Sequence, residues 1–106
     1  MGNMLLLVAA SVTLTNATPA NDPSYWITQN DYPTEALKLK QMGDVGFRLQ
    51  IGSDGRVSSC AITKSSAVVA LDQATCRLLS IRARFKKVRG QGSQSFESKF
   101  FWRMQP

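Results

Sequence analysis

The stretch VGFRLQIGSDGRVSSCAITK (residues 45–64) decides the fold, because it encodes two strands and the turn that joins them. Apolar and polar residues alternate along its first half, which is the pattern of a strand with one buried face. The apolar set is Val45, Phe47, Leu49 and Ile51, and the opposite face carries Gly46, Arg48 and Gln50. The turn is supplied by Gly52, Ser53, Asp54 and Gly55. We therefore predict a β-hairpin at the centre of the chain, with Cys60 and Ile62 of its second strand facing the core.

A helix is predicted on each side of this hairpin. Pro33 suits the first helical position and Gly43 a left-handed cap, so we expect a helix over residues 33–43 with Ala36 and Leu39 facing inward. A second helix is expected over residues 71–85. Its apolar residues form two stripes, and the sequence leaves open which one faces the core. One stripe is Leu71, Ala74, Leu78, Ile81 and Phe85, and the other is Cys76, Leu79 and Ala83.

The last strand is predicted over residues 96–104, after a flexible loop at residues 90–95. Its inward face is expected to carry Phe96, Phe100, Trp102 and Met104, and its outward face Glu97, Lys99, Phe101 and Arg103. A strand, a crossing helix and another strand running the same way normally form a right-handed unit. If the third strand lies beside the first, every neighbouring pair is antiparallel. We predict an α+β fold with a three-stranded antiparallel sheet in the order second, first, third, and with open edges on both outer strands.

We expect the N-terminal part to be a targeting segment and not a part of the folded domain. Residues 4–14 form an apolar run too short for a spanning helix, and Ala17 and Ala20 are each placed to precede a signal-peptidase cut. No Lys or Arg precedes this run, so a short membrane-anchoring segment and a start codon placed too far downstream remain alternatives to a cleaved signal. We divide the chain into a signal-like segment (1–20), a lead-in whose aromatics dock on the domain (21–30) and one domain (31–106).

The chain has two cysteines and no histidine. A zinc site or a thiol nucleophile usually needs histidine or more cysteines, and the seven acidic residues are scattered. We therefore predict no enzyme activity, no metal and no cofactor. In an exported chain Cys60 and Cys76 are expected to form a disulfide, and two separate buried thiols are the alternative.

The net charge of +6 is concentrated in one block. Its members are Arg77, Arg82, Arg84, Lys86, Lys87 and Arg89. Such a block could attract nucleic acid or an anionic surface, and the alternative is a solvated helix face.

An ordered set of residues resembles the C-terminal domain of TonB, the periplasmic end of a bacterial energy transducer. The set is Tyr32, Pro33, Ala36, Gly43, Val45, Asp54, Gly55, Val57, Ser65, Ser66, Leu71, Asp72, Arg84 and Phe85. The resemblance extends over residues 31–103. The cysteine pair is also similar to that of a subset of TonB-like proteins.

The resemblance implies a domain in the periplasm of a Gram-negative bacterium that serves energy-coupled transport of siderophore-type cargo. It binds the TonB box of outer-membrane transporters by strand addition. The partner-binding strand would comprise Phe96, Glu97, Ser98, Lys99, Phe100, Phe101, Trp102 and Arg103. Phe101 is either a contact residue or an exposed aromatic, and Lys99 and Arg103 discourage unwanted pairing of the edge.

Further partners follow from the same resemblance. The inner-membrane motor proteins ExbB and ExbD are expected only if an upstream region with a spanning helix and a proline-rich spacer exists, and the open edges permit a homodimer. Lys86, Lys87 and Val88 stand where the family commonly has a proline-containing turn.

The alternative function is a secreted module that binds anionic surfaces or nucleic acid through residues 77–89. We expect no nucleic-acid partner, because the block lacks aromatic platforms other than Phe85.

Overall fold

The computed structural model describes residues 17–88 and 94–104. Short helical turns come first, and a hairpin, a long helix and a last strand follow. In chain order the elements are η1 (Pro23–Tyr25), η2 (Gln29–Asp31), α2 (Thr34–Lys38), β1 (Gly43–Ile51), β2 (Val57–Lys64), α3 (Val69–Arg82) and β3 (Gln94–Trp102). No helix of the described ranges has the length and apolar content that crossing a membrane requires.

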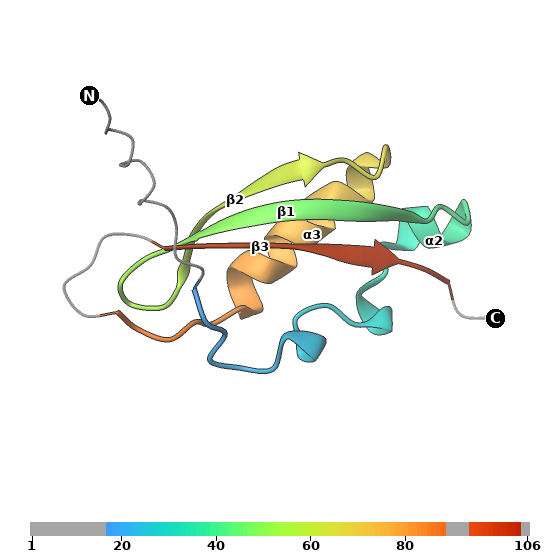
Figure 1. Cartoon of the computed structure of the whole chain (residues 1–106). Helices are drawn as coiled ribbons and strands as arrows, with labels where there is room; N and C mark the ends of the chain where they lie inside the picture. Colours follow the sequence, from blue (N-terminus) through green and yellow to red (C-terminus); the bar gives the residue numbers. More distant parts are fainter. Residues whose placement is uncertain (1–16, 89–93, 105–106) are drawn as a thin grey trace, which may run out of the picture.

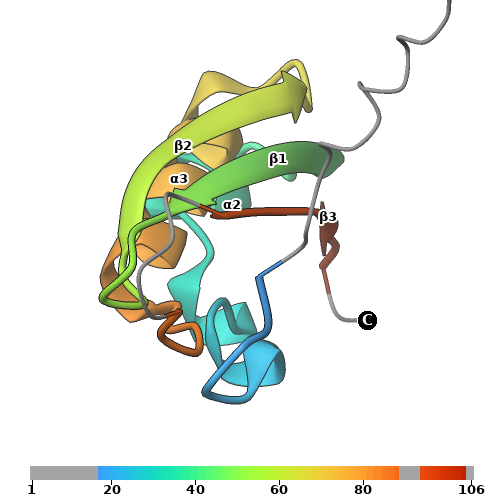
Figure 2. The ribbon, with the colours of Figure 1, turned by 60° about the vertical axis from the view of Figure 1, so that its left-hand side comes forward.

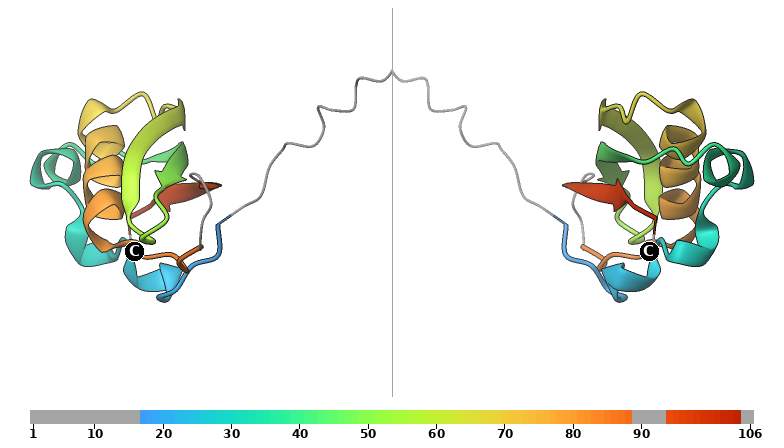
Figure 3. Two further views of the ribbon diagram at one scale, coloured as in Figure 1. Left: turned by 90° about the vertical axis from the view of Figure 1, so that its left-hand side faces the viewer. Right: turned by 90° about the vertical axis from the view of Figure 1, so that its right-hand side faces the viewer.

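The three strands form one antiparallel sheet in the order β2-β1-β3 (Figure 1), which confirms the predicted α+β topology. The helix α3 packs on one face of this sheet, so that the domain has two layers (Figure 3). Within residues 17–88 and 94–104, no helix covers the opposite face. Only β1 has a neighbour on both sides.

The tight turn of the hairpin depends on Gly55. Its φ is +84°, and a Cβ built on this residue would lie 2.2 Å from the carbonyl oxygen of Phe85. The Phe85 amide also donates to the Gly55 carbonyl at 2.8 Å. Glycine is therefore required both for the left-handed backbone and for the close approach of the segment that follows α3.

The buried face of β1 was predicted correctly. Val45, Phe47, Leu49 and Ile51 are at most 3% exposed and form the centre of the core. In β3, Trp102 is buried, and its Nε1 donates at 2.9 Å to Oγ1 of the buried Thr75 on α3. This bond satisfies two polar groups that would otherwise be costly to bury.

The inward face of α3 lies between the two predicted stripes. The buried residues of the helix are Leu71, Ala74, Thr75, Leu78 and Leu79. Ile81, which was assigned to the first stripe, is 60% exposed, and Phe85 is buried but lies beyond the helix. The sheet therefore buries Leu71, Ala74 and Leu78 of the first stripe together with Leu79 of the second, instead of one complete stripe.

The first helix is shorter than predicted. It ends at Lys38, and the left-handed residue after it is Lys40 (φ 54°), while Gly43 begins β1. Ala36 is fully buried as expected, but Leu39 is 60% exposed, so its inward assignment was wrong. After one turn of helix the chain must already turn back toward the sheet, which carries Leu39 outward.

The loop from β2 to α3 is organised by Asp72. Its carboxylate accepts hydrogen bonds from the Ser65 hydroxyl, the Ser66 hydroxyl and the Ser66 amide. Burial raises the pKa of Asp72, but these hydrogen bonds outweigh burial and lower the pKa below its ordinary value. The three residues thus tie the loop before α3 to the first turn of the helix.

The last strand begins earlier than predicted, at Gln94, and ends at Trp102. Its two faces are as predicted, because Phe96, Phe100 and Met104 pack against the core while Phe101 is exposed. Gln94 and Ser95 therefore belong to the strand and not to a loop. The rest of the expected loop, and Arg89, lie outside the described residues.

The N-terminal part of the described chain is attached to the domain. Ala17 is buried and its amide donates to the Ser95 carbonyl at 2.8 Å. Ala20 donates to the Arg84 carbonyl, and Lys86 donates to the Thr18 carbonyl. A signal-peptidase cut after Ala20 would remove all three hydrogen bonds, whereas a cut after Ala17 would remove only the bond to Ser95. Residues 1–16 lie outside the described residues.

The predicted disulfide is present between Cys60 of β2 and Cys76 of α3. Their Cα atoms are 5.7 Å apart, within the range that a disulfide spans. The bond ties the outer strand β2 to the helix.

We predict that replacing both cysteines by serine lowers the free energy of unfolding by about 3 kcal/mol, because the 16-residue loop is no longer closed in the unfolded chain. Urea denaturation of the oxidised protein and the double variant measures this difference. The reduced wild type serves as control and should unfold at nearly the same urea concentration as the double variant. Equal stability of the oxidised and reduced proteins would contradict the prediction.

Candidate partner-binding edge

The outer edge of β3 has backbone groups available for another strand. In an antiparallel pair, alternate residues direct both their N–H and C=O groups toward the partner strand. The carbonyls of Ser95 and Arg103 both accept hydrogen bonds from outside the sheet, from the Ala17 amide and the Gln29 side chain. By alternation, Glu97, Lys99 and Phe101 also direct their backbone groups away from β1.

These two hydrogen bonds mark the ends of the open part of the edge. Between them, the outward backbone groups of Glu97, Lys99 and Phe101 make no hydrogen bond to another described segment. Along β3 the register with β1 is uninterrupted from Gln94 to Trp102. The edge is therefore a short, straight template, long enough for an extended segment of about five residues.

The edge of β2 is less regular. Its register with β1 shifts between Gly46 and Phe47 and again between Gln50 and Ile51. Such irregularities bend a strand and make its edge a poorer template for pairing. Figure 2 shows β2 curving over α3, whereas β3 runs straight. Of the two outer strands, β3 is the better candidate for strand addition.

The outward face beside this edge carries charged side chains and one aromatic. Arg48 of β1 pairs with Glu97 at 3.1 Å, and Arg103 pairs with Asp44 at 2.7 Å. The Arg103 guanidinium also lies 5.6 Å from the centre of the Phe101 ring, and 53% of Phe101 is exposed. Exposed pairs of this kind contribute little to stability. Lys99, at the middle of the edge, is an exposed cation.

A second set of residues faces β3 from the lead-in, beyond its free edge. Trp26 is buried, and its ring lies 5.4 Å from that of Phe85 and 5.9 Å from that of Phe96. The expectation that the lead-in aromatics dock on the domain is confirmed for Trp26 and wrong for Tyr25, which is 72% exposed. In Figure 2 the lead-in runs on the side of β3 that is remote from β1.

The lead-in is held in place by an ion pair that the sequence did not reveal. Both guanidinium nitrogens of Arg82 contact the Asp31 carboxylate, at 2.7 and 2.9 Å, and Arg82 also donates to the Trp26 carbonyl. Asp31 in turn accepts hydrogen bonds from the Thr28 amide and hydroxyl. The Arg82 hydrogen bonds lower the pKa of Asp31 to about 2, and the Thr28 bonds act in the same direction against burial. The hydrogen bond with Asp31 also raises the pKa of Arg82.

The predicted basic block is divided by the fold. Arg82 forms an ion pair with Asp31, and Arg84 donates hydrogen bonds to the carbonyls of Ile81 and Ala83. Arg77, Lys86 and Lys87 are exposed. The guanidinium groups at the end of α3 therefore fix backbone segments in place, and the block is not one continuous cationic surface.

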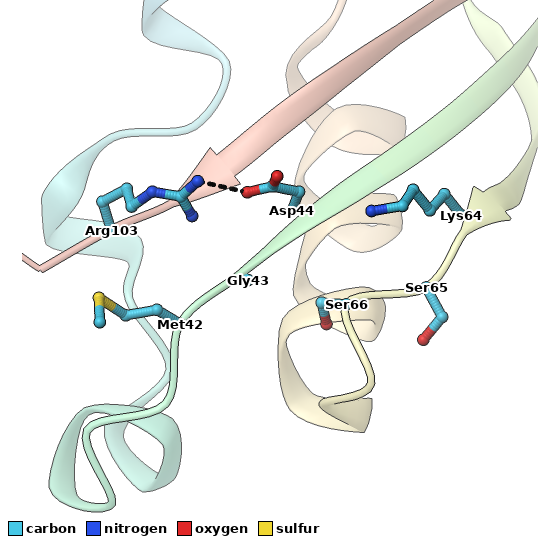
Figure 4. A pocket seen from close by; sticks show the side chains of 7 residues that line it. All are labelled: Met42, Gly43, Asp44, Lys64, Ser65, Ser66 and Arg103. Carbon is cyan, nitrogen blue, oxygen red and sulfur yellow. Dashed lines mark ion pairs between the residues drawn. The ribbon is translucent and has the colours of Figure 1, made fainter.

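A polar pocket lies at the end of the sheet where β1 begins and β2 and β3 end (Figure 4). Asp44 lies between Lys64 on one side and Arg103 on the other. The Oδ1 atom of Asp44 is buried and has the ion pair with Arg103 in place of an aligned hydrogen bond. The hydroxyls of Ser65 and Ser66 at the rim are engaged with Asp72. The pocket lining thus carries two cations, Lys64 and Arg103, and one carboxylate, Asp44, which pairs with Arg103.

The described residues contain no group of three or more His, Cys, Asp or Glu side chains that could hold a metal ion. Of the carboxyls with lowered pKa values, Asp31 pairs with Arg82 and Asp72 accepts hydrogen bonds from the loop before α3. Their roles are structural, and the arrangement of the edge is suited to binding an extended segment.

Comparison with known proteins agrees with this architecture. Residues 28–104 match the family described as Gram-negative bacterial TonB protein C-terminal. The chain is similar to the solution NMR structure of the Pseudomonas aeruginosa TonB CTD, with a TM-score of 0.63 and 22% identity over 87% of this chain and 90% of that chain. No curated protein matches the sequence.

We predict that Asp31→Asn lowers stability at neutral pH and flattens its dependence on acid. The pKa of Asp31 is about 2 in the folded protein and near 3.8 when unfolded, so its contribution is complete above about pH 5 and is lost as the pH falls toward 2. Thermal unfolding at pH 7, 5, 4, 3 and 2 measures this. The wild type and the variant should converge at the acid end. Asp22→Asn is the control, because the Asp22 carboxylate accepts hydrogen bonds from Ser24 in its own turn and from no distant segment among the described residues. A wild-type advantage that persists at pH 2 would contradict the assignment.

Proposed function

This chain belongs to the Gram-negative bacterial TonB protein C-terminal family, and we propose that it binds the TonB box of outer-membrane transporters as an added strand on the β3 edge. The proposal places the domain in the periplasm, where such transporters present short N-terminal segments. The observation that carries it is the open edge at residues 97–101. Main-chain hydrogen bonds along this edge provide affinity, and alternate side chains adjust it.

The charges near the edge support an acidic partner segment. Lys99 lies in the middle of the open edge, and the whole chain has a net charge of +6. A lysine at this place discourages pairing with an unsuitable strand and favours a segment that carries a carboxylate. Phe101 offers an exposed apolar contact on the same face.

The function is mechanical coupling and not catalysis. A strand added along β3 has its hydrogen bonds loaded together when it is pulled along its axis. ExbB and ExbD are partners in this scheme only through an upstream membrane region, and the cargo is of the siderophore type. A homodimer through the β3 edges would compete with the transporter segment for the same backbone groups.

We predict that the complex with a TonB-box peptide resists a pull along the strand better than a pull across it. The reason is that a pull along the strand loads all hydrogen bonds at once, whereas a pull across it breaks them one after another. Single-molecule force spectroscopy with the peptide attached by either end measures the two rupture forces. Rupture at negligible force in both geometries would contradict mechanical coupling.

The binding edge is tested by comparing Lys99→Pro with Lys99→Ala. Lys99 directs its N–H away from β1, so proline at this position removes the central donor of the free edge and spares the β1–β3 ladder. Both variants lose the lysine charge. We expect Lys99→Ala to bind synthetic TonB-box peptides within about fivefold of the wild type, a cost of the order of one surface charge interaction. Lys99→Pro should bind at least about fiftyfold more weakly, because a backbone hydrogen bond is lost and the ring obstructs its neighbours.

Isothermal titration calorimetry measures these affinities, and thermal unfolding verifies that both variants are folded. Equal binding by the proline and alanine variants would show that the peptide binds elsewhere. Absence of binding to the wild type, with peptides from several transporters, would overturn the proposed function.

A further inference from the structure

A small apolar groove lies alongside the open edge, between the lead-in and β3. One wall is formed by Pro23, Trp26 and Ile27, and the other by Phe96, Ser98 and Phe100. Its volume is about 100 Å³. Liquid water occupies about 30 Å³ per molecule, so this space corresponds to a few waters and to one side chain.

The groove exists because Ser98 is small. On the inward face of β3, Ser98 stands between Phe96 and Phe100, and across the ladder it is paired with Phe47. Phe47 is buried beneath it, whereas Ser98 itself is exposed. A large side chain at this position would fill the hollow. Serine leaves an apolar floor accessible at the edge of the sheet.

The lead-in wall of the groove is fixed in advance. The indole Nε1 of Trp26 donates to Asn21 at 2.7 Å, and the carbonyl of Trp26 accepts from Arg82. Arg82 is itself held by Asp31. A wall that is ordered before binding does not add an ordering cost when a ligand enters.

We propose that this groove accommodates one aliphatic side chain of the strand added to β3, on the residue that lies beside Ser98. The inference rests on the proposed function, because the groove is reached from the free edge. Side chains of neighbouring strands at the same position point to the same face of a sheet. The residue beside Ser98 therefore points inward, toward Trp26 and Phe47, while its two neighbours point outward, toward Glu97 and Lys99.

The lining selects the kind of side chain. The walls are aromatic and aliphatic apart from the Ser98 hydroxyl and Lys99, whose stem can border an apolar surface while its ammonium remains in water. A charged or amide side chain would lose its hydration there without an adequate partner. Valine, leucine or isoleucine fits both the size and the polarity.

The test uses the full chain and a phage library of random dodecapeptides. Selected peptides that lose binding to Lys99→Pro are edge binders. We expect these peptides to share one aliphatic residue, and replacing it by serine should weaken binding to the wild type at least about tenfold, the value of burying one such side chain. In Ser98→Leu the protein's own side chain fills the groove, so the same replacement should change binding less than about twofold. Ser59→Leu, on the exposed outward face of β2, is the matched control and should retain the tenfold effect.

Ser98→Val is measured beside Ser98→Leu, so that a folding defect in one variant does not decide the result. Two results would overturn the proposal that the groove binds an aliphatic side chain, and both leave the proposed function intact. The first is a set of edge binders without a shared aliphatic residue. The second is a tenfold loss of binding on the peptide's aliphatic-to-serine replacement that persists in both Ser98 variants. Failure to select any edge binder would overturn both. A wild-type dimer in sedimentation that Ser98→Leu converts to monomer would assign the groove to a second copy of the chain and overturn the proposal.

Discussion

The structure depends on the register of β1, the one strand with neighbours on both sides. Its side chains alternate strictly between the core and the outer face. If β1 shifted by one residue, its buried side chains, Val45, Phe47, Leu49 and Ile51, would all be exposed to water. This cost fixes how β2 and β3 pair with β1. It also fixes which backbone groups of β3 point away from the sheet, and therefore where a further strand can be added.

The lead-in has two roles because the domain is small. The helix α3 covers one face of the sheet but does not cover the end near Phe85 and Phe96, where Trp26 completes the core. By packing there, the lead-in comes to lie beyond the free edge of β3 and forms a wall beside it. The Asp31–Arg82 ion pair thus contributes both to stability and to the shape of the candidate site.

The two outer strands differ in the regularity of their edges. The edge of β2 is interrupted by register shifts, and the strand is attached to α3 by the Cys60–Cys76 disulfide. The edge of β3 is straight, with its open part limited to residues 97–101 by contacts from Ala17 and Gln29. A short open edge reduces the risk of unspecific aggregation and retains a place for one extended partner. This arrangement accords with membership of the TonB protein C-terminal family.

The sequence by itself determined the hairpin, the strand faces and the disulfide, because alternation and cysteine context can be recognised without knowing which segments meet in space. The sheet order was predicted with the help of the family resemblance. It also indicated β3 as the last strand, with Phe101 on the outside. Only the tertiary structure decided the inward face of α3, the exposure of Leu39, the use of Arg82 as an ion-pair partner and the groove beside Ser98. Each of these depends on which distant segment lies opposite a side chain, and periodicity shows that a face is apolar without showing what covers it.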